Sequence, residues 1–171
     1  VGKRSNITQA TTSLIKIDTS FSARKKKAII IASDKYIASN IWLPLVTPSR
    51  DGQDIAGILK TKFGYDTTLL INPTRDVILK TIDEIAFKEN SNPHDQYIIY
   101  FAGHGFWEQR RKTGYIVPVN AASFQNEQLP ESAELSTYID YHVLFNNLNH
   151  LNKVLLITDV CFGGTSFNSI V

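Results

Sequence analysis

The chain has 171 residues, of which 43% are hydrophobic and 20% are charged, as expected for one globular domain rather than a disordered or fibrous protein. Its net charge of +2 gives no reason to expect a nucleic acid or a membrane as a partner. No apolar stretch approaches the roughly 18 residues of a membrane span and no signal peptide is visible, so we expect a cytoplasmic protein.

The N-terminal residues differ from the rest of the chain. They are rich in Ser and Thr without a hydrophobic period, so residues 1–26 are predicted to be a linker or arm and residues 27–171 the folded domain. Within that domain, short apolar runs rich in β-branched residues predict four strands buried on both faces. They cover residues 28–32, 67–71, 97–101 and 154–158, and a shorter strand is predicted at 114–118.

Helical periodicity separates these strands. Helices are predicted from Asp51 to Gly64, from residues 72–74 to residue 86, and after Asp140, whereas residues 120–137 are polar and irregular. Apolar strands that alternate with amphipathic helices indicate an α/β fold with a mostly parallel sheet and helices on both faces. In such sheets, ligands bind beyond the carboxyl ends of the strands.

Two reactive side chains follow strands of this predicted sheet. His104 comes just after the third buried strand and Cys161 just after the fourth, each close to glycine. A lone cysteine is more often a small buried hydrophobe, but a thiolate beside an imidazole is a nucleophile. The imidazole can stabilise the thiolate and later protonate a leaving amine. The backbone N–H groups of Gly105 and Cys161 can together hold an oxyanion.

The segments that carry these residues resemble a known family. Residues 98–105 and 155–164 are similar to the two catalytic segments of caspase-like cysteine peptidases (peptidase family C14), and look closest to metacaspases, paracaspases and their bacterial relatives. The spacing of 57 residues between His104 and Cys161 (161 minus 104) suits that family. The resemblance implies a caspase-like three-layer sandwich and a cysteine endopeptidase with a Cys–His dyad.

The resemblance also implies roles for two acidic residues. In metacaspases and paracaspases, an acid two residues before the nucleophile and another in the first loop line the pocket for the substrate residue that precedes the cut. Asp159 and Asp51 match these positions, which favours cleavage after Arg or Lys. The alternatives are that Asp51 is a helix N-cap, that Asp159 bonds local amides, or that Arg50 lines the pocket and gives a caspase-like preference for Asp.

The resemblance further implies that this chain corresponds to a caspase large subunit. We expect a C-terminal small-subunit chain or segment as a partner, because the strand at 154–158 would otherwise be a bare apolar sheet edge. A protein substrate, a sensor or regulatory module and autocatalytic cleavage of a zymogen, at basic pairs such as Lys3-Arg4 or Arg110-Arg111, are further implications. No cofactor and no metal site are predicted; some metacaspases need calcium, but the acidic residues here are too scattered to predict a site.

Three other functions fit the sequence less well. A catalytically inert caspase-like interaction module would be expected to lack the cysteine or its histidine, and both are present. A nucleotide binder needs a glycine-rich turn after the first strand, and a cysteine phosphatase needs an arginine after the nucleophile; neither is found. The remaining histidines, His94, His142 and His150, lack a glycine frame, so no catalytic role is predicted for them. Trp42 and Trp107 flank the proposed cleft in sequence; the alternatives for Trp107 are a wall of the substrate groove and, as the default, packing in the core or in a lid.

Overall fold

The computed structural model describes residues 25–88, 93–123 and 132–162. The predicted arm therefore lies, up to residue 24, outside the described residues, as do Gly163 and Gly164 after the cysteine. In chain order the elements are β1 (Lys26–Ala32), α1 (Pro48–Phe63), β2 (Asp66–Ile71), α2 (Arg75–Lys88), β3 (Gln96–Glu108), β4 (Thr113–Ile116), α3 (Ser132–Leu135), β5 (Ile139–Asp140), α4 (Tyr141–Leu148) and β6 (Val154–Phe162).

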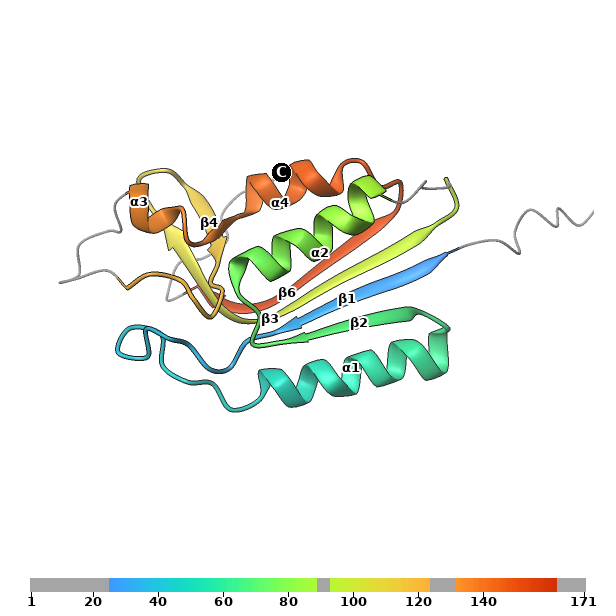
Figure 1. Cartoon of the computed structure of the whole chain (residues 1–171), viewed down its shortest axis with the longest axis horizontal. Helices are drawn as coiled ribbons and strands as arrows, with labels where there is room; N and C mark the ends of the chain where they lie inside the picture. The colour runs from blue at the N-terminus through green and yellow to red at the C-terminus, as the bar shows by residue number, and fades with distance from the viewer. Residues whose placement is uncertain (1–24, 89–92, 124–131, 163–171) are drawn as a thin grey trace, which may run out of the picture.

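The strands form one six-stranded sheet (Figure 1). Strands β2, β1, β3 and β6 lie side by side in that order and are all parallel. The long strand β3 continues past the end of β1, and there β4 pairs with it antiparallel, followed by β5. The predicted α/β fold with a mostly parallel sheet is confirmed, and its antiparallel end makes the sheet mixed.

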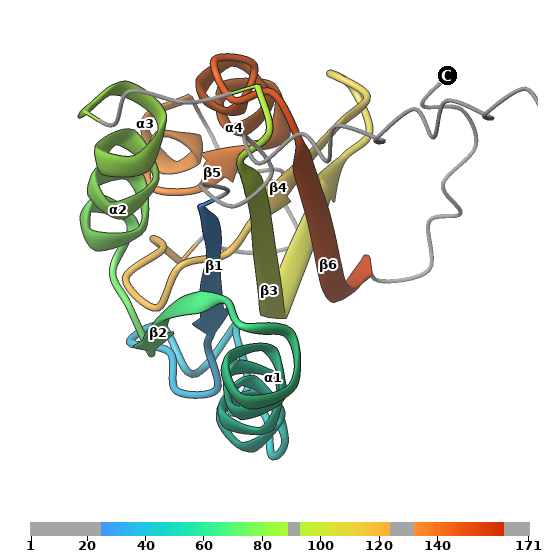
Figure 2. The same ribbon diagram turned by 90° about the vertical axis from the view of Figure 1, so that its right-hand side faces the viewer.

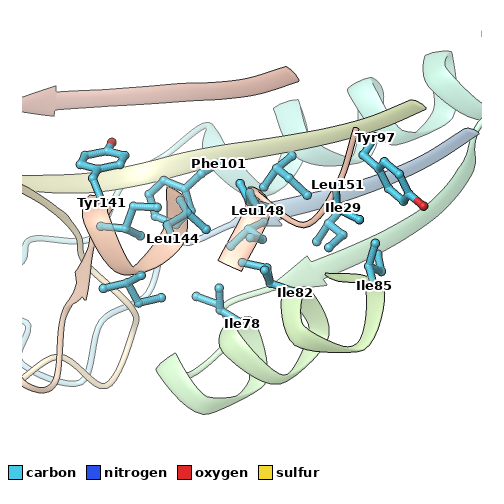
Figure 3. Close-up of a cluster of buried hydrophobic side chains, with 14 residues drawn as sticks. Ile29, Ile78, Ile82, Ile85, Tyr97, Phe101, Tyr141, Leu144, Leu148 and Leu151 are labelled. Atoms are coloured by element: carbon cyan, nitrogen blue, oxygen red, sulfur yellow. The ribbon is translucent and has the colours of Figure 1, made fainter. Parts of the chain in front are cut away.

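Helices cover both faces of the sheet, which gives three layers (Figures 1 and 2). On one face, α1 packs over small and β-branched residues of the central strands, among them Ala28, Ile30 and Ala102. On the other face, α2 and α4 bury the larger cluster shown in Figure 3, which includes Ile29 and Phe101. Because β1 and β3 are covered on both sides, their central residues read as unbroken apolar runs in the sequence.

A third cluster lies beyond the parallel strands, at the end where β3 meets β4. It is aromatic, and it joins the loop after β1 to the segment between β4 and β5. Its buried members are Tyr36, Trp42, Tyr115, Val117, Ala121, Leu135 and Tyr138. This cluster supports the carboxyl end of β3, where the proposed catalytic histidine lies.

Several elements differ from the sequence-based expectations. Helix α1 begins at Pro48 rather than Asp51, because proline suits the first turn of a helix, where its missing N–H is not needed. Residues 120–137, predicted irregular, contain the short helix α3 in their described part. Strands β3 and β6 run further than predicted, because the two pair with each other as far as Gly105 and Phe162.

Candidate active site

The backbone brings His104 and Cys161 to the same position of two neighbouring strands. In the parallel ladder between β3 and β6, Ala102 pairs with Asp159 and His104 pairs with Cys161. Neighbouring strands lie ~4.8 Å apart. The expectation that both residues lie just past their strand ends is wrong, because each lies inside a strand that the pairing extends. The prediction that they meet at one edge of the parallel sheet agrees with this register.

Three groups hold the imidazole of His104. Its Nε2 lies 2.8 Å from the carbonyl oxygen of Leu43. Its ring packs between aromatic rings, with centroid distances of 4.8 Å to Tyr36 and 5.4 Å to Trp42. Because a carbonyl oxygen only accepts hydrogen bonds, Nε2 carries a proton in this arrangement. The neutral ring therefore keeps Nδ1 as the nitrogen that can take up a proton.

A pocket of about 230 Å³ adjoins His104 and holds both predicted acidic residues. Asp51 comes from the first turn of α1 and Asp159 from β6, so elements more than a hundred residues apart in the chain meet here. The other lining residues are Leu45, Val46, Thr47, Pro48, Ala102 and Gly103. The pocket is thus lined by two carboxylates together with several apolar side chains.

The phenol of Tyr100 joins this acidic pair. Its hydroxyl donates to Oδ2 of Asp159 over 3.2 Å. Burial, together with the negative charges of Asp159 and Asp51, raises the pKa of Tyr100 to about 12. The hydroxyl therefore remains a donor that fixes one oxygen of Asp159.

The structure bears on each alternative for the acidic residues. The N-cap of α1 is Thr47, and Asp51 lies in the first helical turn, so Asp51 is not the cap. Asp159 accepts from a side-chain hydroxyl, as described above. Arg50 is 78% exposed and reaches only within 4.0 Å of Asp51, and it is not among the residues that line the pocket.

Gly105, predicted to contribute to an oxyanion site, is a regular residue of β3. It pairs with Ile116 of β4 and with Phe162 of β6. The unusual backbone belongs instead to Gly103, with a φ of 156°. A Cβ on Gly103 would lie 2.7 Å from the hydroxyl oxygen of Tyr36, so a side chain there would collide with that phenol.

The sequence-based interpretation missed the residues that contact His104 and Asp159. Tyr36, Leu43 and Tyr100 carry no motif of their own, because they reach the site only through the path of a loop and the register of two strands. Trp42, which flanks the cleft in the sequence, is buried, and its ring centroid lies 5.4 Å from that of His104. Trp107 packs instead against the main core cluster.

Two of the other histidines have local partners away from the pocket. His142 lies at the start of α4, where its Nδ1 is 3.0 Å from Oδ1 of Asp140. His150 packs against the ring of Phe87, with a centroid distance of 4.6 Å. Neither lines the pocket beside His104.

The turn between β3 and β4 is built around a buried carboxylate. Glu108 accepts hydrogen bonds from the backbone N–H of Arg111 over 2.7 Å and of Arg110 over 3.1 Å, and from Nε of Arg110 over 3.3 Å. Burial alone would raise the pKa of Glu108, but these donors bring it below the ordinary value of a glutamate. The two arginines are thereby held in a tight hairpin turn.

Neither a metal site nor a membrane helix is found in the part of the chain that the structure describes. Over those residues, no three His, Cys, Asp or Glu side chains gather closely enough to hold an ion. None of the described helices has the length and apolarity needed to cross a bilayer.

Comparison with known proteins gives one family and one fold. The caspase domain family matches residues 25–170 of this chain. Among solved structures, the chain is similar to that of protein GSU0716 from Geobacter sulfurreducens, with a TM-score of 0.62 and 17% identity over 82% of this chain and 52% of that chain. This chain thus spans about half the length of that protein, and the likeness shows the fold alone. A search of curated proteins finds no match.

Proposed function

Because the chain belongs to the caspase domain family, we propose that it is the catalytic part of a cysteine endopeptidase, with Cys161 as nucleophile and His104 as general acid and base. The observation that carries the proposal is the register of β3 and β6, which pairs His104 with Cys161 beside an open pocket. The protein is proposed to act in the cytoplasm, on protein substrates.

The arrangement around His104 supports a thiolate mechanism. Nδ1 of the neutral ring takes the thiol proton of Cys161, and the thiolate attacks the carbonyl carbon of the scissile bond. The C–N bond then breaks, the amine leaves with the proton from His104, and a thioester remains on Cys161 until water hydrolyses it. The carbonyl of Leu43 holds the imidazole in one orientation throughout, because its bond to Nε2 is kept in both protonation states.

The oxyanion formed in this reaction needs hydrogen-bond donors. We assign that role to the backbone N–H groups of Gly105 and Cys161, which lie on the two paired strands that carry the dyad. Gly105 pairs with Phe162 and Cys161 pairs with His104 in this ladder, so the pairing of β3 with β6 has to open there before these N–H groups can bind an oxyanion.

The proposed substrate preference is for Arg or Lys before the cut. Asp51 and Asp159 place two carboxylates in one pocket beside His104, and a guanidinium can pair with both. An acidic substrate residue would meet like charge there. A caspase-like preference for Asp would require Arg50 to line the pocket, which its exposed side chain does not do in this structure.

We also propose that further strands, from a small-subunit chain or segment, complete the sheet beside β6. Among the described strands, β6 pairs with β3 alone, and two of its apolar side chains are exposed, Leu155 by 55% and Ile157 by 41%. Activation by proteolytic processing and control by a sensor or regulatory module belong to the same proposal.

A panel of fluorogenic peptides that differ only in the residue before the cut tests this function. We expect cleavage after Arg or Lys, no cleavage by Cys161→Ala, and a loss of several orders of magnitude with His104→Ala. His142→Ala, which changes an exposed histidine outside the pocket, is the matched control and should keep wild-type activity. Turnover by purified Cys161→Ala protein would contradict the assignment of the nucleophile, and a preference for Asp peptides would contradict the pocket.

A folded full-length protein that cleaves none of these peptides would favour the alternative of an inert caspase-like interaction module. The same panel therefore decides between the two functions.

A further inference from the structure

His104 lies on a stretch of β3 that no longer pairs with β1 and does not yet pair with β4. The ladder between β1 and β3 ends at Ala32 and Ala102, and β4 begins to pair with β3 only at Gly105. Along a strand, backbone groups point alternately to one side and the other. Ser33 N–H donates to the carbonyl of Ala102 on the β1 side, so the backbone groups of His104 also point to the side that β1 has left.

The hydroxyl of Tyr36 fills this gap. It accepts a hydrogen bond from the backbone N–H of His104 over 2.8 Å and donates one to the carbonyl of Ser33 over 3.0 Å. The carbonyl of His104 accepts from Val117 N–H over 3.1 Å, so both backbone groups of His104 are satisfied. One side chain thus ties the end of β1 to the continuation of β3.

The same side chain also contacts the imidazole. The rings of Tyr36 and His104 lie 4.8 Å apart between centroids, at an interplanar angle of 49°. Gly103 makes this contact possible, since a Cβ at that position would lie 2.7 Å from the Tyr36 hydroxyl. Tyr36 therefore touches both the backbone and the ring of His104.

The protonation of Tyr36 does not change over the range in which peptidases work. Burial raises the pKa of Tyr36 to about 12. Its hydroxyl therefore keeps one donor and one acceptor role at neutral pH, and any pH effect seen in a variant arises elsewhere.

We propose that Tyr36 is a positioning residue for His104, a role that rests on the proposed function of the dyad. It sets the backbone of His104 through the hydroxyl and the ring plane through the aromatic contact. Small displacements of a catalytic group lower the rate of reaction strongly, whereas substrate binding in the acidic pocket does not need Tyr36. The phenol is absent from the lining of that pocket.

Tyr36→Phe in the full-length protein tests this proposal. The change keeps the ring and removes both hydrogen bonds, so we expect kcat to fall by about tenfold or more with KM within about twofold. Alkylation of Cys161 by iodoacetamide should show a pH profile displaced to higher pH, because a displaced imidazole stabilises the thiolate less well. The ring resonances of His104 in NMR spectra should shift.

Tyr138→Phe is the matched control. Tyr138 belongs to the same buried aromatic cluster and donates to the carbonyl of Ala122 over 2.7 Å, without a contact to His104. It should lower stability to a similar extent and leave kcat, the alkylation profile and the His104 resonances unchanged. Equal losses of kcat in both variants would show that Tyr36 has only a structural role. Unchanged kcat, alkylation profile and His104 resonances in Tyr36→Phe would overturn the proposal.

Failure of the proposed function gives a different result. If Cys161→Ala keeps the wild-type turnover, the proposed dyad is wrong, independently of the result obtained with Tyr36→Phe. The resonances of His104 in Tyr36→Phe still report, without any turnover, whether the phenol positions the ring.

Discussion

Asp51 and Asp159 have different surroundings although they share a pocket. Asp159 accepts from Tyr100, so one of its oxygens is fixed and the other is left for a ligand. Asp51 is partly exposed at the start of a helix, where the N-terminal end of the helix dipole favours a negative charge. A cationic side chain that enters the pocket can therefore pair with both carboxylates.

Asp159→Asn and Asp51→Asn should each weaken activity on Arg peptides. Asp159 is exposed and Asp51 is partly exposed, so losing one of these ion pairs costs on the order of 1 kcal/mol, which corresponds to a fall in kcat/KM of about fivefold. Asp54→Asn changes an exposed carboxylate of the same helix, outside the pocket lining, and should have no effect. Steady-state kinetics on one Arg peptide checks all three variants, and equal effects of Asp54→Asn and Asp159→Asn would refute the pocket.

Helix α1 owes its position to a glycine that touches the sheet. A Cβ on Gly52 would lie 2.9 Å from Cβ of Ala32 and 3.4 Å from Cγ2 of Ile30. Only a residue without a side chain allows the helix to approach β1 this closely. Asp51 precedes this contact, so the distance between helix and sheet also sets where its carboxylate lies.

Gly52→Ala and Gly57→Ala make a matched pair on this helix. Gly52→Ala should destabilise the protein by about 1–3 kcal/mol through overpacking, and should lower activity on Arg peptides because α1 moves. Nothing lies within 4 Å of a Cβ on Gly57, so Gly57→Ala should stabilise the helix by ~0.5–1 kcal/mol. Denaturant unfolding measures both changes in the free energy of unfolding. Changes of the same sign would show that contact with the sheet does not cause the difference between the two substitutions.

At the scale of elements, the sequence predicted the order of strands and helices but not where β3 and β6 end. Runs of apolar residues indicate burial, and they stop at polar or small residues such as Gly103 and Asp159. The backbone pairing continues past these residues, because pairing depends on neighbouring strands and not on hydrophobicity. The register that sets His104 against Cys161 is a property of the sheet and could not be predicted from either segment alone.

The whole molecule has one face of its sheet that α1 covers only in part. Leu155, Ile157 and Asp159 lie on the same face as the residues beneath α1, since they pair with Ile98, Tyr100 and Ala102. β6 lies at the outer edge of the parallel strands, beyond this helix (Figure 2). An apolar edge of this kind is a template for further pairing.

Hydrogen exchange should reveal a cover over this edge in the full-length protein. The amides of β6 that point away from β3 should be protected there and exchange rapidly in a fragment of residues 25–162, if that fragment remains folded. Amides of β1, which lies between two strands, serve as the internal reference and should be protected in both. Rapid exchange at the edge of β6 in the full-length protein together with any small-subunit chain would contradict the proposed small-subunit strands.

A bond can match the specificity of a peptidase and still be protected by the shape of the chain around it, as in the hairpin turn built around Glu108. A peptidase with the proposed preference would find a dibasic match at Arg110-Arg111 within its own chain. Substrate grooves that pair with main-chain groups take an extended segment, whereas these arginines are bent back and tied through their N–H groups to one carboxylate. Straightening them would also open the pairing of Glu108 with Thr113. We therefore expect the shape of this turn to protect the Arg110-Arg111 bond from a peptidase with the proposed specificity.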